Sequence, residues 1–246
     1  MFPVAAHKAA ESASIAKTLD IGRAIAVFTP RGVRELSAER RIAIGKAMQN
    51  VFRETFVDGS GISTPEDQFF ATFGEGRLDE EQLSKLKSNF GEVTADKDGA
   101  GVRISLPESM TKAQQELKLR LPKASVGMDM VSYVEGTLKG EQPHVYVIQT
   151  DTGWTEDLGL LSYSISMKQF FPCNQEEGQA WLKRYVDIED KAERLKLLRE
   201  LHLRILSEPW VVPLIGQPYF TLVRSPWVYK GPTLFNSGAL WRFHHP

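Results

Sequence analysis

Between residues 102 and 150 the sequence alternates strand patterns with helix patterns, and this order constrains the fold more than any other feature. Strand patterns occur at Val102–Leu106, Val126–Val131 and Val145–Thr150, with helix patterns between them at Thr111–Leu121 and, more weakly, Ser132–Leu138. Parallel neighbouring strands require a crossover connection, which is usually a helix. The order therefore predicts an α/β fold with a mostly parallel sheet flanked by helices.

Two further apolar segments, one before and one after this run, have the patterns of additional strands of the sheet. Ile21–Thr29 has the pattern of a buried strand, and Trp210–Ile215 is rich in β-branched and aromatic residues. Pro30–Leu36 is predicted to form a loop. Ser37 is a good N-cap for an amphipathic helix over Ala38–Phe56, so a strand, a loop and a helix follow one another here.

A long amphipathic helix is predicted before the second of these strands. Apolar residues recur at spacings of three and four over Leu195–Leu206, and Pro209 ends the helix. Acidic residues crowd its start, where free backbone N–H groups favour negative charge. After the strand, residues 216–218 are predicted to form a turn into another strand at Tyr219–Val223. Shorter helices are predicted at Asp79–Phe90 and Leu160–Met167.

The composition is that of an ordinary globular protein and excludes several kinds of site. The 246 residues carry a formal net charge of −1, so there is no electrostatic argument for nucleic-acid binding. Cys173 is the only cysteine, which excludes an internal disulfide; among aromatic neighbours it is predicted to be a small core residue. No stretch reaches the ~20 apolar residues of a membrane span, and no signal peptide is recognisable. We expect either a cytoplasmic protein or a piece of a longer precursor, with residues 1–20 as a linker or tag-like N-terminus and residues 21–246 as one domain.

No residue pattern typical of a catalytic or metal site is found. The histidines lack a metal-ligand spacing with nearby carboxylates, including His144, His202, His244 and His245. The serines of the LLSYSIS segment lack the G-x-S-x-G pattern of a nucleophile elbow, and no glycine-rich loop is followed by the residues that bind phosphate. We therefore expect no enzymatic activity, no metal and no cofactor.

Two segments carry a family resemblance. The segment ILSEPWVVPLIGQPYFTLVRSPWVYKG, with the end of the helix before it, supplies matching positions at Glu193, Arg194, Leu198, Glu200, Ile205, Glu208, Val212, Pro213, Leu214, Tyr219, Val228 and Gly231. The segment VFTPRGVRELSAERRIAIGKAMQNVFRETF supplies Arg40, Arg41, Ala43, Ile44, Ala47 and Met48. In these positions the chain resembles the extracellular solute-binding proteins of family 5, which serve oligopeptide, dipeptide and nickel transporters. The resemblance covers about residues 22–243.

The resemblance implies a fold and a role. It implies the second lobe of a type II periplasmic-binding-protein fold, with the partner lobe absent from this chain. Such a protein would be the substrate-binding component of an ABC transporter, would hold peptides or similar small solutes between two lobes, and would deliver them to a membrane permease from the periplasm. The alternative is an effector-binding domain of a transcriptional regulator with the same fold, which would be cytoplasmic.

The loop after the strand Val145–Thr150 is the candidate ligand site, because open α/β sheets bind ligands beyond the carboxyl ends of their strands. In this loop Trp154 offers a flat apolar wall and Asp157 a carboxylate, a pair suited to the α-ammonium group of a peptide. The resembled family has a corresponding GW..D pattern whose acid holds the ligand's N-terminus. This carries the ligand-binding role to Trp154 and Asp157, with Thr155 between them.

Two alternatives remain open at this loop. Asp151 takes the role of the acid if the alignment shifts by six residues. In the other alternative, the acidic residues form the N-terminal turn of the helix predicted at Leu160–Met167, and Trp154 belongs to the core.

Overall fold

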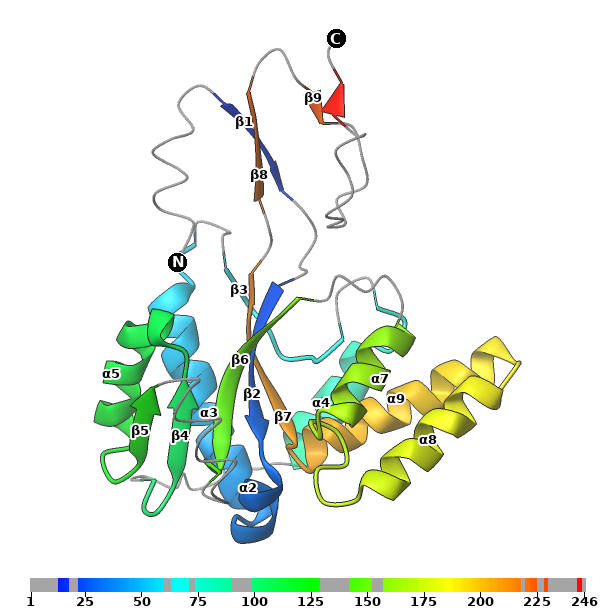
Figure 1. The fold of residues 1–246 in the computed structure, drawn as a ribbon, viewed down its shortest axis with the longest axis horizontal. Coiled ribbons are helices and arrows are strands. Elements are labelled where there is room, and N and C mark those ends of the chain that lie inside the picture. Colours follow the sequence, from blue (N-terminus) through cyan, green and yellow to red (C-terminus); the bar gives the residue numbers. More distant parts are fainter. Residues whose placement is uncertain are drawn as a thin grey trace.

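The computed structural model describes residues 13–17, 22–59, 63–70, 74–89, 99–128, 142–151, 157–217, 220–224, 228–229 and 243–244. A six-stranded sheet stands at the centre, with helices on both of its faces (Figure 1). Its strand order is β3-β7-β2-β6-β4-β5. The strands are β2 (Gly22–Phe28), β3 (Thr64–Pro65), β4 (Arg103–Leu106), β5 (Ser125–Met128), β6 (Val145–Asp151) and β7 (Val211–Gln217).

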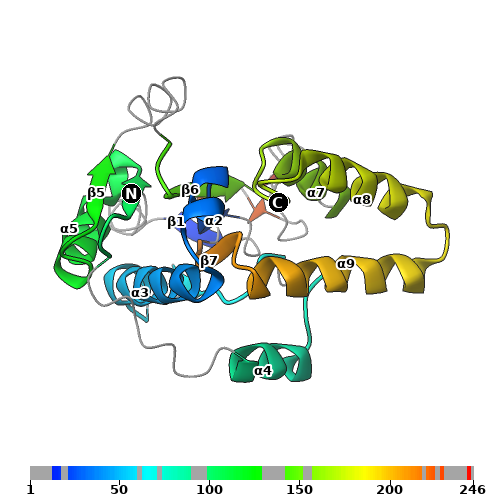
Figure 2. The same cartoon turned by 90° about the horizontal axis from the view of Figure 1, so that it is seen from below.

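The helices cover the two faces of this sheet. The elements that follow β2 and β3 are α2 (Pro30–Glu35), α3 (Ala38–Phe56) and α4 (Glu80–Asn89), and those around β4 are the short 3₁₀ helix η1 (Glu108–Met110) and α5 (Thr111–Arg120). The second half of the chain contributes α7 (Asp157–Ser166), α8 (Gln175–Asp187) and α9 (Lys191–Ser207). Seen from below, α3 and α5 lie on one side and α7, α8 and α9 on the other (Figure 2). No helix in the described part of the chain is long and apolar enough to cross a membrane.

The strand directions confirm the predicted α/β fold. β4 pairs in parallel with both β5 and β6, as the alternating segment between residues 102 and 150 predicted. β2 is antiparallel to both of its neighbours, β6 and β7, so β5, β4, β6 and β7 all run in one direction. The short β3 is antiparallel to β7. The weak helix predicted at Ser132–Leu138 lies outside the described residues.

Two apolar cores form because every residue of β2 is buried and successive side chains point to opposite faces. Ala24, Ala26 and Phe28 belong to the core beneath α3 and α5, while Ile25 and Val27 belong to the core beneath α7 and α9. This explains the unbroken apolar pattern of the strand. Fully burying one such aliphatic or aromatic side chain stabilises the fold by about 1.5–3 kcal/mol.

The helix over Ala38–Phe56 is confirmed with the predicted bounds, and the Ser37 hydroxyl accepts a hydrogen bond from the backbone N–H of Arg40. The loop predicted at Pro30–Leu36 is wrong, because α2 occupies most of it. Thr29 caps this helix by accepting from the N–H of Gly32, and Pro30 at the first helical position has a suitable φ. The proline marks the start of a helix here, not a turn.

The long C-terminal helix is confirmed as α9, with Asp190 as its N-cap. The helix α8 before it was not predicted. Its N-cap is Asn174, whose side chain accepts from the N–H of Glu177 and donates to the Glu177 carboxylate. Asn is a preferred N-cap residue, so the sequence carried a start signal for the helix.

The turn predicted at residues 216–218 is wrong for its first two residues, since Gly216 and Gln217 continue β7. Gly216 lies between Arg23 of β2 and Thr64 of β3, so sheet pairing on both sides keeps it extended. The strand predicted at Tyr219–Val223 is found as β8 (Phe220–Arg224), and it pairs with β1 (Ala13–Lys17) in a separate antiparallel sheet.

β1 lies within residues 1–20, for which the sequence predicted a linker. The ribbon of β1 and β8 stands above the six-stranded sheet in Figure 1, beyond the ends of β2 and β7. The short strands β9 (Val228–Tyr229) and β10 (Phe243–His244) form another antiparallel pair.

Candidate functional site

The carboxyl ends of β4, β5, β6 and β7 lie at one edge of the sheet, called the upper edge here after its position in Figure 1. Asp151, the last residue of β6, lies opposite Gly22 of β2, and Gly22 lies opposite Gln217 of β7. Beyond this edge, open α/β sheets form the crevices in which ligands bind. The upper edge is therefore the candidate functional site.

Two of the predicted ligand residues, Asp151 and Asp157, belong to the described part of the chain and lie at or next to this edge. Asp151 ends β6 and Asp157 begins α7, so the two carboxylate residues bound the loop between the strand and the helix. Trp154 and Thr155 lie outside the described residues. The helix predicted at Leu160–Met167 begins one turn earlier than expected, at Asp157. A carboxylate at the N-terminus of a helix interacts favourably with the helix dipole. This agrees with the alternative in which the acidic residues form the N-terminal turn of the helix. A ligand-binding role for Asp157 stays a prediction.

A buried arginine next to the upper edge was not predicted. Arg23, the second residue of β2, is only 1% exposed and lies opposite Thr150 and Gly216. Its guanidinium donates a hydrogen bond to the backbone carbonyl of Phe69. The sequence signal was an arginine inside an otherwise apolar strand. A charged side chain is buried only where polar groups form hydrogen bonds with it.

Phe69 belongs to a segment, residues 66–78, that joins β3 to α4 and is held by hydrogen bonds from several sides. The backbone N–H of Phe69 donates to Nε2 of His202 on α9 over 3.0 Å, and Nδ1 of His202 lies 2.9 Å from the carbonyl oxygen of Gly76. The Gln68 side-chain amide donates to the Leu78 carbonyl and accepts from the Leu78 N–H. Residues 71–73 of this segment are outside the described part.

His202 fits this role because it is neutral. Burial lowers the pKa of His202 to about 3, so near neutral pH one ring nitrogen accepts and the other donates. Since Nε2 accepts from Phe69, Nδ1 carries the proton and donates to Gly76. The ring also makes an edge contact with Phe70, 4.9 Å between centroids. The sequence predicted a packed or solvated residue here, and the structure shows that His202 is packed.

A buried carboxylate completes the anchoring of this segment. Glu66 is 3% exposed, and one of its oxygens accepts from the backbone N–H groups of Asp67 and Gln68. The same oxygen lies 3.4 Å from the guanidinium of Arg77. The segment that passes beside the candidate site is thus fixed by charged and polar groups that sequence patterns alone did not pair.

His144, which has no metal-ligand spacing in the sequence, lies away from the upper edge. His144 precedes β6 at its lower end, where Nδ1 accepts from the backbone N–H of Arg103 and Nε2 lies 2.9 Å from the Glu35 carboxylate. Burial lowers the pKa of His144. The Arg31 hydrogen bond, followed by that of His144, lowers the pKa of Glu35.

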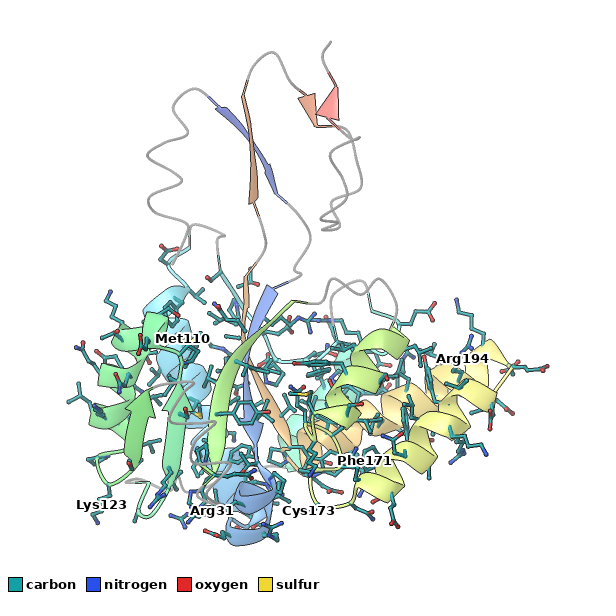
Figure 3. All side chains as sticks on the ribbon, viewed as in Figure 1. Arg31, Met110, Lys123, Phe171, Cys173 and Arg194 are labelled. Carbon is teal, nitrogen blue, oxygen red and sulfur yellow. The ribbon has the colours of Figure 1, made fainter. Side chains whose placement is uncertain are left out.

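Cys173 lies at the lower end of the molecule, near α2 (Figure 3). The prediction that it is a core residue is wrong, because its side chain is exposed and its sulfur lies 3.6 Å from the carbonyl oxygen of Pro30. Phe170 and Phe171 take the buried positions instead, and Phe171 has a left-handed backbone with φ 52° that turns the chain outward before Cys173. Among the described residues, no group of three or more His, Cys, Asp or Glu side chains is placed to hold a metal ion.

Solved structures with a similar fold include ABC transporter substrate-binding proteins. The substrate-binding protein CtaP from Listeria monocytogenes superposes on 97% of this chain with a TM-score of 0.66 and 13% identity, and the match covers 53% of that chain. NikA from Brucella suis, solved with Fe(III)-EDTA, matches 97% of this chain and 54% of its own with a TM-score of 0.66 and 14% identity. The chain has the fold of these binding proteins.

DppA from Helicobacter pylori, solved in complex with the peptide STSA, matches 98% of this chain with a TM-score of 0.65 and 15% identity. The match covers 50% of DppA, so this chain spans about half the length of the binding proteins that share its fold. No protein-family model and no curated protein matches the sequence.

Proposed function

We propose that this chain is a substrate-binding component of an ABC transporter and that it forms largely the second of two lobes between which a ligand binds. The observation that carries this proposal is the match of nearly the whole chain to about half of each of several transporter binding proteins. In this proposal residues 21–246 make up the lobe, and a second lobe closes over the upper edge. Closure matters because one lobe alone buries only part of a ligand's surface.

The ligand class proposed is peptides or similar small solutes with a free ammonium group. Asp157 holds the ammonium, Trp154 covers the neighbouring apolar part of the ligand, and Thr155 lies between them. Asp151 replaces Asp157 if the ligand sits closer to the end of β6, since the two acids bound the same loop. Either carboxylate supplies a charge-assisted hydrogen bond.

The remaining parts of the proposal follow from the same role. The partner is the membrane permease of the transporter, the place of action is the periplasm, and binding proceeds without covalent chemistry, so the protein is not an enzyme. The segment formed by residues 66–78 acts as a fixed support beside the ligand, because Arg23 holds it to β2 and His202 holds it to α9, while Gln68 links its two ends.

The test is saturation-transfer NMR on the chain with a mixture of short peptides, a method that detects weak binding to one lobe. Free peptides should give signals and N-acetylated peptides of the same sequences should not. Asp157→Asn should weaken binding by about 1.5–3 kcal/mol, the worth of a hydrogen bond to a charged group. The matched control is Glu200→Gln, which removes an exposed carboxylate on α9. Equal signals from free and acetylated peptides would contradict the role of the acid, and loss of binding only in Asp151→Asn would move that role to Asp151.

A further inference from the structure

A pocket on the α3 side of β7 is separate from the upper edge. It has a volume of about 460 Å³ and lies among α3, α4, the carboxyl end of α9 and the first residues of β7. In Figure 2 the end of α9 nearest β7 adjoins α3, and α4 lies below α9. Val211–Pro213 line it, and the upper edge begins at Gln217, four or more residues along β7, or about 13 Å at 3.3 Å per residue. The volume falls within the range of small-molecule pockets, about 300–1,000 Å³.

The inner wall of the pocket is apolar. Leu83 and Leu86 of α4 and Leu206 of α9 line it together with Val212, and these leucines also form a small apolar cluster of their own. The backbone of β7 contributes little polarity, since Pro213 has no N–H and its carbonyl oxygen already accepts from the Gln49 side chain over 2.8 Å. An extended peptide strand therefore finds little to pair with, whereas a hydrocarbon arm fits the wall.

The rim of the pocket is polar and carries an excess of positive charge. Lys46, Gln49, Asn50 and Arg53 recur at spacings of three and four along α3, so they form one stripe that faces the pocket. Asp67 is the one acid among the lining residues, and it pairs with Arg53 over 2.5 Å. The Lys46 ammonium and the Asn50 amide are exposed, and no residue of the described part of the chain bonds to either side chain. One cation and one amide thus remain available to a ligand.

We propose that this pocket binds a small amphipathic anion, a carboxylate with an unbranched hydrocarbon arm. The arm lies against Leu83, Leu86 and Leu206, and the carboxylate accepts charge-assisted hydrogen bonds from Lys46 and a neutral one from Asn50. The site is independent of the proposed transport ligand, which binds at the upper edge.

The probe is octanoate, titrated into the whole chain and compared with octylamine, which has the same arm and the opposite charge. Octanoate should bind more tightly than octylamine. Lys46→Glu should weaken octanoate binding about tenfold, the equivalent of one charged contact, and reverse the preference in favour of octylamine. The control Lys112→Glu makes the same charge change on an exposed lysine of α5, outside the pocket, and should leave both affinities unchanged.

A second variant tests the place of binding. Leu86→Trp fills the pocket and should abolish octanoate binding without changing peptide binding at the upper edge. The proposal is overturned if octanoate does not bind below about 10 mM, if Lys46→Glu leaves the preference between the two probes unchanged, or if peptides compete with octanoate. Failure of peptide binding alone would count against the proposed function and leave this pocket unaffected.

Discussion

The two faces of the central sheet are packed differently. The core under α3 and α5 is built from apolar side chains such as Ile44, Met48 and Phe52, which need no hydrogen-bond partners. The core under α7 and α9 is also apolar in the main, but it encloses the buried polar side chains of Arg23 and His202. These polar groups reach the segment formed by residues 66–78 next to the upper edge. The first core is therefore held by apolar packing, and the second also positions a segment beside the candidate site.

The substitution with the largest expected effect on stability is on the apolar face. Phe52 on α3 is fully buried, and its ring lies 5.4 Å from that of Phe56. Phe52→Ala should lower the free energy of unfolding by about 3–5 kcal/mol, because it removes apolar burial and leaves a cavity. Urea denaturation measures this loss. A loss below 1 kcal/mol would mean that this core is far less tightly packed than described.

The second effect is on the polar face. His202→Leu introduces an apolar side chain of similar size and removes the hydrogen bonds of the ring to the Phe69 N–H and the Gly76 carbonyl. Each buried group that loses its partner should cost about 1–3 kcal/mol. Hydrogen exchange should speed up at residues 66–70 and 74–78 before it does in α3, which Phe52→Ala would not produce. Uniform exchange across both faces would contradict a local anchoring role.

The third effect is a dependence of stability on pH, which arises from His202 on the polar face. The pKa of His202 is lowered to about 3 in the folded state and is near 6.5 in the unfolded chain. The unfolded state therefore binds a proton that the folded state rejects, so stability is full above pH 6.5 and is lost as the pH falls towards 3. The slope is up to about 1.4 kcal/mol per pH unit. Urea denaturation between pH 7 and 5 should show this slope of the unfolding free energy for the wild type and a shallower slope for His202→Gln. Identical slopes would mean that His202 binds a proton in the folded state as readily as in the unfolded state.

The smallest effect contrasts a satisfied polar group with an unsatisfied one on the same face. Ser164 of α7 is fully buried, and its hydroxyl has no hydrogen-bond partner in the described part of the chain. Ser164→Ala should be neutral or stabilising by up to about 1 kcal/mol, because it removes a buried hydroxyl that pays a desolvation cost. Thermal unfolding measures the change. Destabilisation by more than 1 kcal/mol would show that this hydroxyl has a partner.

The difference between the faces also explains which features the sequence could predict. The strands β2, β4, β6 and β7 and the helix α3 follow from apolar periodicity, which is local, and the bounds of α3 and β6 agree closely with the structure. β1 and β3 were not predicted. α2 was missed because Pro30 and Gly32 were taken as turn residues, although Thr29 and Pro30 together form a helix start. α8 was missed although Trp181, Leu182 and Tyr185 lie at helical spacing and pack against the core.

The polar groups beside the candidate site could not be predicted from local patterns. Phe69 and His202 are separated by 133 residues in the sequence, and Arg23 and Phe69 by 46, so only the tertiary structure brings them together. Arg23 was recognisable as an anomaly in an apolar strand but not as a partner of a particular carbonyl. The position of Asp151 at the upper edge could be predicted, because the direction of β6 determines where that strand ends.

We propose the upper edge as the place where the ligand binds. Hydrogen exchange followed by mass spectrometry, with and without a mixture of short free peptides, tests it most directly. The account predicts slower exchange at the end of β6 and the start of α7, around Asp151 and Asp157, with α3 and α5 unchanged. Slower exchange only in other regions, or unchanged exchange throughout at peptide concentrations of about 10 mM, would contradict it.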